Sequence, residues 1–158
     1  MIGTIDVVKL AEHLGEEVAV SDWLDITQER IDRFAEATDD HQWIHVDAAR
    51  AAAESPFHTT VAHGFLTLSL VSVLARRALT IGRIRMAVNY GVNRVRFMSP
   101  VPAGSRIRGR FTLAAVSEAG GGTRVTWSVT VEREDGDKPC CVAEWLVRYY
   151  PLEAGTWG

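Results

Sequence analysis

The chain has 158 residues, of which 47% are apolar and 23% are charged, and its formal net charge is −3 at pH 7. This length suits one domain with a sizeable core, and the composition is that of ordinary soluble globular proteins. The slightly acidic balance gives no sign of nucleic acid or an anionic membrane as a partner.

The first forty residues predict a lead-in, one strand and one helix. Residues 1–17 are expected to be peripheral, with a short helical turn at 7–13, and residues 17–24 alternate loosely as a strand does. Thr27 can cap a helix that ends near Asp39. The first residues lack the basic region and apolar run of an export signal, so we expect a cytoplasmic protein. The apolar face of the helix is expected to comprise Ile31, Phe34, Ala35 and Thr38.

The stretch 39–47 (DDHQWIHVD) holds carboxylates and imidazoles more densely than any other part of the chain. Within it, Asp40 and His45 are five residues apart. On a continuous helix their side chains would diverge by about 140°, so they can reach one small molecule only if the chain turns between them. Residues 46–53 then predict a second short helix, which Asp47 is placed to cap.

The most apolar helix of the chain is predicted after the loop 58–60 and is expected to end at Gly82. Apolar residues occupy nearly all of its faces, which is typical of a buried helix. Gly64 lies at its N-terminus, where a backbone N–H is free and no side chain obstructs it. This amide can act as an oxyanion donor, and close packing is the alternative role of the glycine. The apolar residues are Phe65, Leu66, Leu68, Leu70, Val71, Val73, Leu74 and Leu79.

From Arg83 onward the pattern changes to alternation with β-branched and aromatic residues, which predicts a meander of four strands. The elements predict an α+β domain over residues 1–150, with an antiparallel sheet wrapped around the long buried helix, and a loose tail at 151–158. Exposed sheet edges need cover, which a second subunit can provide. Cys140 and Cys141 should point to opposite faces of a strand, one core and one surface, without forming a disulfide. The strands are expected at 84–97, 105–116, 124–132 and 139–149.

Three sequence blocks resemble the MaoC-like dehydratase family, which includes the (R)-specific enoyl-CoA hydratases and a NodN-like branch. The first block (DHQWIH, starting at Asp40) is similar to the family's Asp followed by Asn-Pro-Leu-His. The second is 61–72 (VAHGFLTLSLVS), and the third is 89–97 (NYGVNRVRF), which leads into PVPAG at 100–104. The resemblance covers about residues 15–150. It implies a hot dog fold, a homodimer with its site at the subunit interface, and reversible hydration of trans-2-enoyl-CoA to (R)-3-hydroxyacyl-CoA.

The resemblance implies that Asp40 and His45 hold one water and supply the general acid–base catalysis of hydration. Without it, Asp40 is a turn cap and His45 a partly buried structural histidine. Ser72 matches a serine that hydrogen-bonds the catalytic carboxylate, and a serine bonded to its own helix is the alternative. Where the family has Asn-Pro, this chain has Gln42-Trp43, so a carboxamide is kept on a longer arm and the stiffening proline is lost.

Substrate contacts are expected from Trp43 and Phe57 along the acyl chain, from His63 beside the oxyanion position, and from Arg94 at the phosphates of coenzyme A. Core packing or a solvated surface is the alternative for each. No metal site is expected, and no cofactor, because coenzyme A is part of the substrate. Further arginines that can meet phosphate are Arg76, Arg77, Arg83, Arg85 and Arg106.

Two other functions are alternatives to the hydratase. A hot dog thioesterase usually places a carboxylate on or beside the central helix, whereas residues 61–79 contain no Asp or Glu. A non-catalytic acyl-CoA-binding accessory protein has no need of the pair Asp40 and His45. The predicted function is therefore an enoyl-CoA hydratase or 3-hydroxyacyl-CoA dehydratase.

Overall fold

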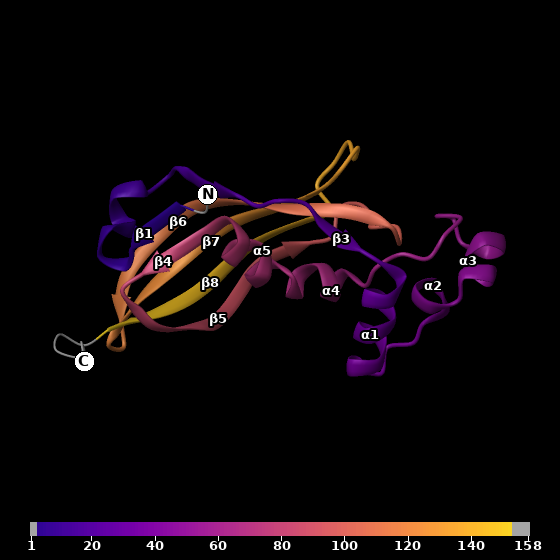
Figure 1. Ribbon diagram of the computed structural model, residues 1–158, viewed down its shortest axis with the longest axis horizontal. Helices are drawn as coiled ribbons and strands as arrows, with labels where there is room; N and C mark the ends of the chain where they lie inside the picture. Colours follow the sequence, from indigo (N-terminus) through magenta and orange to yellow (C-terminus); the bar gives the residue numbers. More distant parts are fainter. Residues whose placement is uncertain (1–2, 153–158) are drawn as a thin grey trace.

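An antiparallel sheet at one end and a group of short helices at the other give the molecule an elongated shape (Figure 1). The structure is a computed structural model and describes residues 3–152. The main sheet has the order β2-β6-β7-β8-β5, with β3 also paired to β6. Its strands are β2 (Glu17–Val20), β3 (Leu24–Ile26), β5 (Ile84–Arg96), β6 (Ser105–Ala119), β7 (Gly122–Arg133) and β8 (Cys141–Pro151).

Two further strands and six helical segments complete the fold. Strands β1 (Gly3–Asp6) and β4 (Leu79–Gly82) pair in parallel as a separate small sheet. Helix α5 packs against the main sheet, and α1, α2 and α3 extend away from it (Figure 1). The helical segments are η1 (Val7–His13), α1 (Gln28–Thr38), α2 (Trp43–Val46), α3 (Ala48–Glu54), α4 (Gly64–Ser69) and α5 (Val71–Ala78).

The four long strands lie close to the predicted ranges, but their order is not that of a meander. Strand β5 pairs with β8 and not with β6, so it lies at the far edge of the sheet. The connection 97–104 crosses between the edges: the Met98 amide donates to the Cys140 carbonyl beside β8, and the Gly104 amide donates to the Ile26 carbonyl in β3. Two prolines in this connection lack the N–H that a hairpin ladder needs.

The predicted central helix is shorter and less buried than expected. It consists of α4 and α5, which meet at Leu70, and it ends at Ala78 because the next four residues form β4. One face is buried, with Leu74 fully inaccessible, whereas Phe65 on another face is 68% exposed. The expectation of a helix buried on all faces is wrong, because the sheet covers one side of it only.

The N-terminal segment is part of the core and not peripheral. Strand β1 pairs with β4, and the 3₁₀ helix η1 turns Val7 and Leu10 into the main apolar cluster. The short helical turn expected at 7–13 is confirmed. It contributes two buried side chains that the weak periodicity of these residues did not predict.

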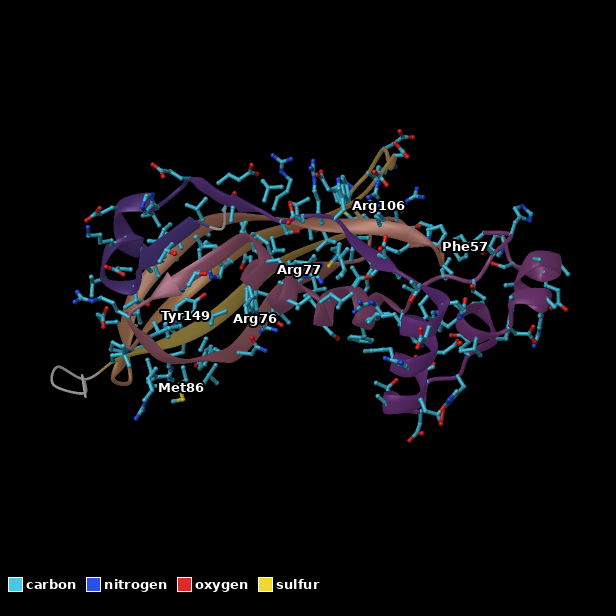
Figure 2. The ribbon with its side chains drawn as sticks, viewed as in Figure 1. Phe57, Arg76, Arg77, Met86, Arg106 and Tyr149 are labelled. Atoms are coloured by element: carbon cyan, nitrogen blue, oxygen red, sulfur yellow. The ribbon has the colours of Figure 1, made fainter. Side chains whose placement is uncertain are left out.

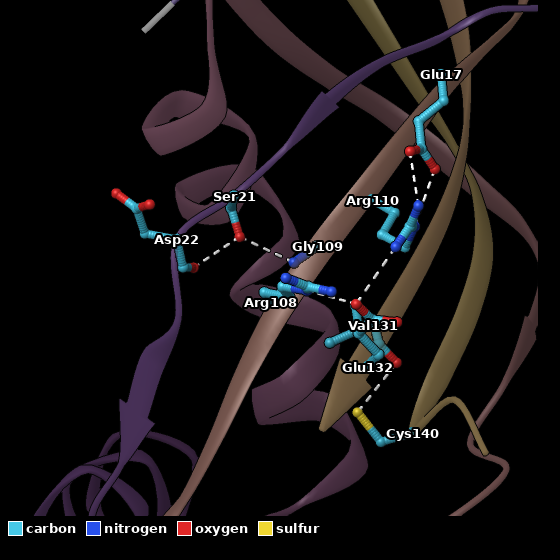
Figure 3. A network of polar contacts seen from close by, with 9 residues as sticks. All are labelled: Glu17, Ser21, Asp22, Arg108, Gly109, Arg110, Val131, Glu132 and Cys140. Carbon is cyan, nitrogen blue, oxygen red and sulfur yellow. Dashed lines mark hydrogen bonds and ion pairs between the residues drawn. The ribbon is translucent and has the colours of Figure 1, made fainter. Parts of the chain in front are cut away.

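Ser21 divides the strand expected at 17–24 into β2 and β3. Its amide donates to the Gly109 carbonyl, and its hydroxyl accepts from the Gly109 N–H at 2.9 Å and donates to the Asp22 carbonyl (Figure 3). The serine side chain therefore takes the place of a backbone partner, and the ladder resumes at Leu24.

An ion-pair ladder crosses the surface of β2, β6 and β7 (Figure 3). Arg110 donates to both carboxylate oxygens of Glu17, at 2.9 and 2.7 Å, and lies 3.6 Å from Glu132. Glu132 also accepts from Arg108. These side chains are partly exposed, so the ladder contributes modestly to stability. Its main effect is to tie the short strand β2 to the long strands beside it.

Both cysteines are buried and neither forms a disulfide within the described residues. The expectation that one thiol lies at the surface is wrong, because Cys140 precedes β8 and its Sγ donates to the Val131 carbonyl at 3.2 Å. Pro151 ends β8, so the predicted tail begins later than expected, and residues 153–158 lie outside the described part. Within residues 3–152, no helix combines the length and the apolar character needed to cross a membrane.

Candidate functional site

The site begins where α1 ends. The helix starts after Thr27, whose hydroxyl accepts from the Arg30 amide at 3.1 Å, so the predicted cap is confirmed. It stops at Asp39, which has a left-handed conformation with φ of 59°. Aspartate tolerates this conformation better than most residues. The chain therefore turns sharply just before Asp40.

The turn predicted between Asp40 and His45 is confirmed. The Gln42 amide approaches the Asp40 carboxylate at 3.5 Å, and the His45 amide donates to the Gln42 carbonyl at 3.0 Å as α2 begins. Thus Gln42 meets the carboxylate through its main chain, and its side chain makes no capping bond. Asp47 then caps α3 by accepting from the Arg50 amide at 3.0 Å, as predicted.

His45 is a buried imidazole with a defined tautomer. Only 7% of the residue is exposed, and Nδ1 lies 2.6 Å from the Val61 carbonyl. A carbonyl only accepts, so Nδ1 carries the hydrogen and Nε2 presents a lone pair. Burial lowers the pKa of His45 and His63 lowers it further, while the Val61 bond and Asp40 raise it. The net lowering favours neutral His45 near pH 7, ready to accept a hydrogen bond or a proton.

His63 lies directly against His45. Its ring stacks on the His45 ring with centroids 3.8 Å apart and planes tilted by 24°, and Phe34 packs 4.9 Å away. The Nε2–H of His63 donates to the main-chain carbonyl of Asp40 at 2.9 Å. The residue is 2% exposed, and its Nδ1 is buried without a partner among residues 3–152.

Asp40, His45 and His63 each offer one polar atom, and these atoms lie within 4.8 Å of one another. A zinc ion bound by both imidazoles would lie close to the plane of each ring, about 2.0–2.1 Å from the nitrogen that binds it. The rings are stacked with centroids 3.8 Å apart and planes tilted by only 24°, so a point near the plane of one ring lies well out of the plane of the other. The arrangement therefore suits hydrogen bonding to water or substrate better than metal coordination.

A residue that the sequence did not single out ties this site to α1. Gln28 donates to the His45 carbonyl at 2.7 Å and accepts from the Thr60 hydroxyl. The Val61 amide donates to the Ile44 carbonyl at 3.0 Å on the other side of α2. Gln28 is the first residue of α1 after its cap, and no local pattern marks it, because its partners lie 17 and 32 residues away.

Gly64 begins α4 directly after His63. Its amide lies in the first turn, where N–H groups have no acceptor within the helix. The ring of Phe97 packs closely over it: a Cβ on Gly64 would lie 2.8–2.9 Å from three ring carbons. Gly64 therefore does allow close packing, the alternative role of this glycine. This role is compatible with the backbone N–H acting as a donor.

The remaining predicted site residues are scattered. Ser72 lines two cavities and forms no hydrogen bond with Asp40 within the chain. Trp43 stacks beneath the guanidinium of Arg50, 4.3 Å from its ring centroid. Phe57 is half-exposed at the helical end of the molecule (Figure 2), and Arg94 is exposed and pairs with Glu144 at 3.7 Å. Neither Trp43 nor Phe57 is among the residues that line the two cavities along α4 and α5.

Two cavities lie between the central helix and the sheet. One, of about 290 Å³, lies beside Phe65 and Leu68, and the other, of about 380 Å³, reaches past Ala75 to Tyr149. Figure 2 shows Tyr149 and Arg76 at the sheet end of the molecule, away from Phe57. The walls of both cavities include Ser72, Asn89 and Trp145, and the Trp145 indole donates to the Asn89 side chain at 3.0 Å.

Comparisons with known proteins agree with this architecture. A family model described as "MaoC like domain" matches residues 9–135. The 3-hydroxyacyl-thioester dehydratase Z of Mycobacterium tuberculosis is 54% identical over 144 residues, which cover 90% of this chain and 95% of that protein. Nodulation protein N of Rhizobium leguminosarum bv. viciae is 46% identical over 144 residues, which cover 90% of this chain and 89% of that protein.

Solved structures support the fold. The R-hydratase PhaJ1 from Pseudomonas aeruginosa superposes with a TM-score of 0.71 at 22% identity, over 94% of this chain and 92% of that chain. This likeness confirms the expected hot dog fold. Since the family model spans most of the chain and the similar proteins include a named dehydratase, the chain is a hydro-lyase that belongs to the MaoC-like dehydratase family.

Proposed function

We propose that the protein catalyses the reversible, (R)-specific hydration of trans-2-enoyl thioesters, with Asp40 and His45 as the catalytic pair. The observation that carries this proposal is the neutral, buried imidazole of His45, which lies in one cluster with the Asp40 carboxylate and whose Nε2 is not engaged by the Val61 carbonyl. Two such groups can hold one water molecule between them. General acid–base catalysis of this kind is worth about 10²–10⁴-fold in rate.

Hydration requires two proton movements and one charge to be stabilised. The water oxygen bonds to the β-carbon while one of its protons passes to the pair, and the α-carbon receives a proton from the pair. Because both events occur on one face of the double bond, the addition is syn. Negative charge develops on the thioester oxygen, and the Gly64 N–H at the start of α4 is our proposed donor to it.

The proposed substrate carries its acyl group on a thiol carrier, which we take to be coenzyme A. The carrier is part of the substrate, so the reaction needs no further cofactor. The two cavities along α4 and α5 supply an apolar space for the acyl chain, and the smaller one is lined by Phe65, the residue after Gly64. This supports a substrate longer than crotonyl, with Trp145 and Asn89 along the chain in place of Trp43 and Phe57.

We also propose that the active form is a homodimer. Strand β5 pairs only with β8 within the described residues, and nearly all of its length is exposed. An exposed edge strand of thirteen residues is prone to pair with other chains and aggregate unless a partner covers it. Large apolar side chains add to this surface on and beside β5, among them Met86, Val88, Tyr90, Val92, Phe97 and Met98.

Sedimentation tests the dimer. We expect a dimer at micromolar concentration and a shift toward monomer in Val88→Asp, because a carboxylate in an apolar interface is costly. Val8→Asp is the matched control, since Val8 is exposed on η1, away from β5. A wild-type protein that sediments only as a monomer would count against an interface through β5.

The activity test follows the loss of enoyl absorbance with crotonyl-CoA and longer trans-2-enoyl-CoAs. We expect Asp40→Asn and His45→Gln to lower kcat by about 10²–10⁴-fold while both variants stay folded. Asp39→Asn is the matched control, because asparagine keeps the left-handed conformation and leaves Asp40 untouched. Chiral chromatography of the hydrolysed product should give the R enantiomer.

Other outcomes separate the rival functions. Release of free coenzyme A without loss of the double bond would favour the thioesterase. Binding of acyl-CoA with no chemistry would favour the accessory protein. Full activity in both Asp40→Asn and His45→Gln would show that these two residues are not the catalytic pair.

A further inference from the structure

We propose that His63 is a positioning residue that aligns Asp40 and His45 with each other. This inference rests on the proposed function, because it assigns His63 a part in the work of that pair. It is carried by three contacts: a hydrogen bond to the Asp40 main chain, a ring stack on His45, and a tilted ring contact with Phe34. The side chain of His63 therefore contacts both members of the pair.

The hydrogen bond fixes the backbone that carries the carboxylate. Asp40 lies in the loop between α1 and α2, and its side chain is exposed. Its carboxylate has a long contact of 3.5 Å with the Gln42 amide, whereas its carbonyl receives the His63 Nε2–H at 2.9 Å. His63 therefore ties this loop to the start of α4, where Gly64 follows.

The stack fixes the plane of the other catalytic ring. The Val61 carbonyl holds His45 at Nδ1, which sets one point of the imidazole but leaves it free to tilt about that bond. The His63 ring lies 3.8 Å away and supports the His45 ring along its face, and Phe34 supports His63 from a further side. Together these contacts set the direction of the His45 Nε2 lone pair.

The same contact makes His63 part of the electrostatic environment of His45. Among the described residues, the titratable groups that act on His45 are His63 and Asp40, with opposite effects on its pKa. The neighbours from α1, Phe34 and Gln28, are uncharged.

Two substitutions of His63 separate these effects. His63→Phe keeps an aromatic ring against His45 but removes the N–H donor to Asp40. His63→Gln removes the ring, but its amide can donate to the Asp40 carbonyl. His58→Asn is the control, because His58 is an exposed loop histidine with φ of 57°, a conformation that asparagine tolerates.

Steady-state kinetics on enoyl-CoA give the first readout. We expect His63→Phe to lower kcat by about 10²-fold, the typical effect of misplacing a catalytic group by an ångström, with KM changed little. His63→Gln should recover about tenfold of that loss, and His58→Asn should match the wild type. Wild-type kcat in His63→Phe, or an equal loss in His63→Gln, would overturn the proposal.

An NMR titration of the His45 ring gives a second readout that needs no activity. We expect the pKa of His45 to rise in both His63 variants, because the nearby imidazole that lowers it is gone, and the Asp40 amide signal to shift in His63→Phe but far less in His63→Gln. An unchanged His45 titration would overturn the positioning role. If the wild type hydrates no enoyl thioester, the proposed function fails, and this titration still decides whether His63 aligns the pair.

Discussion

Replacing Gly64 with alanine tests the close approach between the central helix and the end of β5. The new Cβ would lie 2.8–2.9 Å from three carbons of the Phe97 ring, well inside the optimal carbon separation of about 3.5–4.0 Å. Overpacking of this kind costs about 1–3 kcal/mol. Phe97 is nearly half-exposed and can shift, so the lower part of that range applies.

Two opposing effects set the net change in stability. Gly→Ala at a compatible backbone position stabilises by about 0.4–1 kcal/mol through the unfolded state, and Gly64 has no left-handed φ to forbid alanine. We therefore expect a net destabilisation of about 1 kcal/mol and a fall in Tm of about 2–4 °C. Calorimetry on Gly64→Ala, with Phe97→Leu as the single control, measures it.

The double variant Gly64→Ala with Phe97→Leu separates packing from catalysis. Leucine removes the ring atoms that the Cβ would meet, so we expect the Tm of the double variant to return to that of Phe97→Leu alone. Activity should stay reduced, because the added methyl group also lies beside the amide that we assign to the thioester oxygen. An unchanged Tm in Gly64→Ala would refute the steric reasoning, and full activity in the double variant would refute the role of the amide.

Three further predictions concern the core, the pH dependence and the thiols. Leu74→Ala should cost about 2–5 kcal/mol in urea unfolding, because Leu74 is 0% exposed between α5 and the sheet, whereas Val8→Ala, at a residue 72% exposed, should stay within about 0.5 kcal/mol. Since folding lowers the pKa of His45, the unfolded chain takes up this proton at higher pH than the folded chain. Tm should therefore fall as pH drops from about 7 to 5, and less so in His45→Gln; an identical slope in both proteins would contradict this assignment. Burial raises the pKa of Cys140 to about 12 and that of Cys141 to about 11, so neither should react with a disulfide reagent near pH 8 until the protein unfolds, and fast labelling of the folded protein would disagree.

Local signals in the sequence were sufficient for the elements that depend on local chemistry. Thr27 and Asp47 cap their helices through bonds to amides three residues on, which sequence spacing alone specifies. The long strands follow from alternation and turn residues. The need for a turn between Asp40 and His45 followed from helix geometry, and the three sequence blocks were specific enough to indicate the family and its fold.

Contacts between distant residues decided the rest. Strand β5 lies beside β8 because the connection 97–104 crosses the sheet, and β4 replaces the end of the predicted helix because β1 returns to pair with it. Neither pairing can be predicted from the local periodicity of the sequence.

At the site, the sequence indicated Asp40, His45 and Gly64 as functional residues, but not the contacts that keep them in place. The tautomer of His45 depends on the carbonyl of Val61, and the stack with His63 depends on the fold bringing the start of α4 against α2. The identity of a residue shows which hydrogen bonds its side chain can donate or accept. Only the tertiary structure determines which partner it meets, because that partner arrives from 16 or 23 residues away.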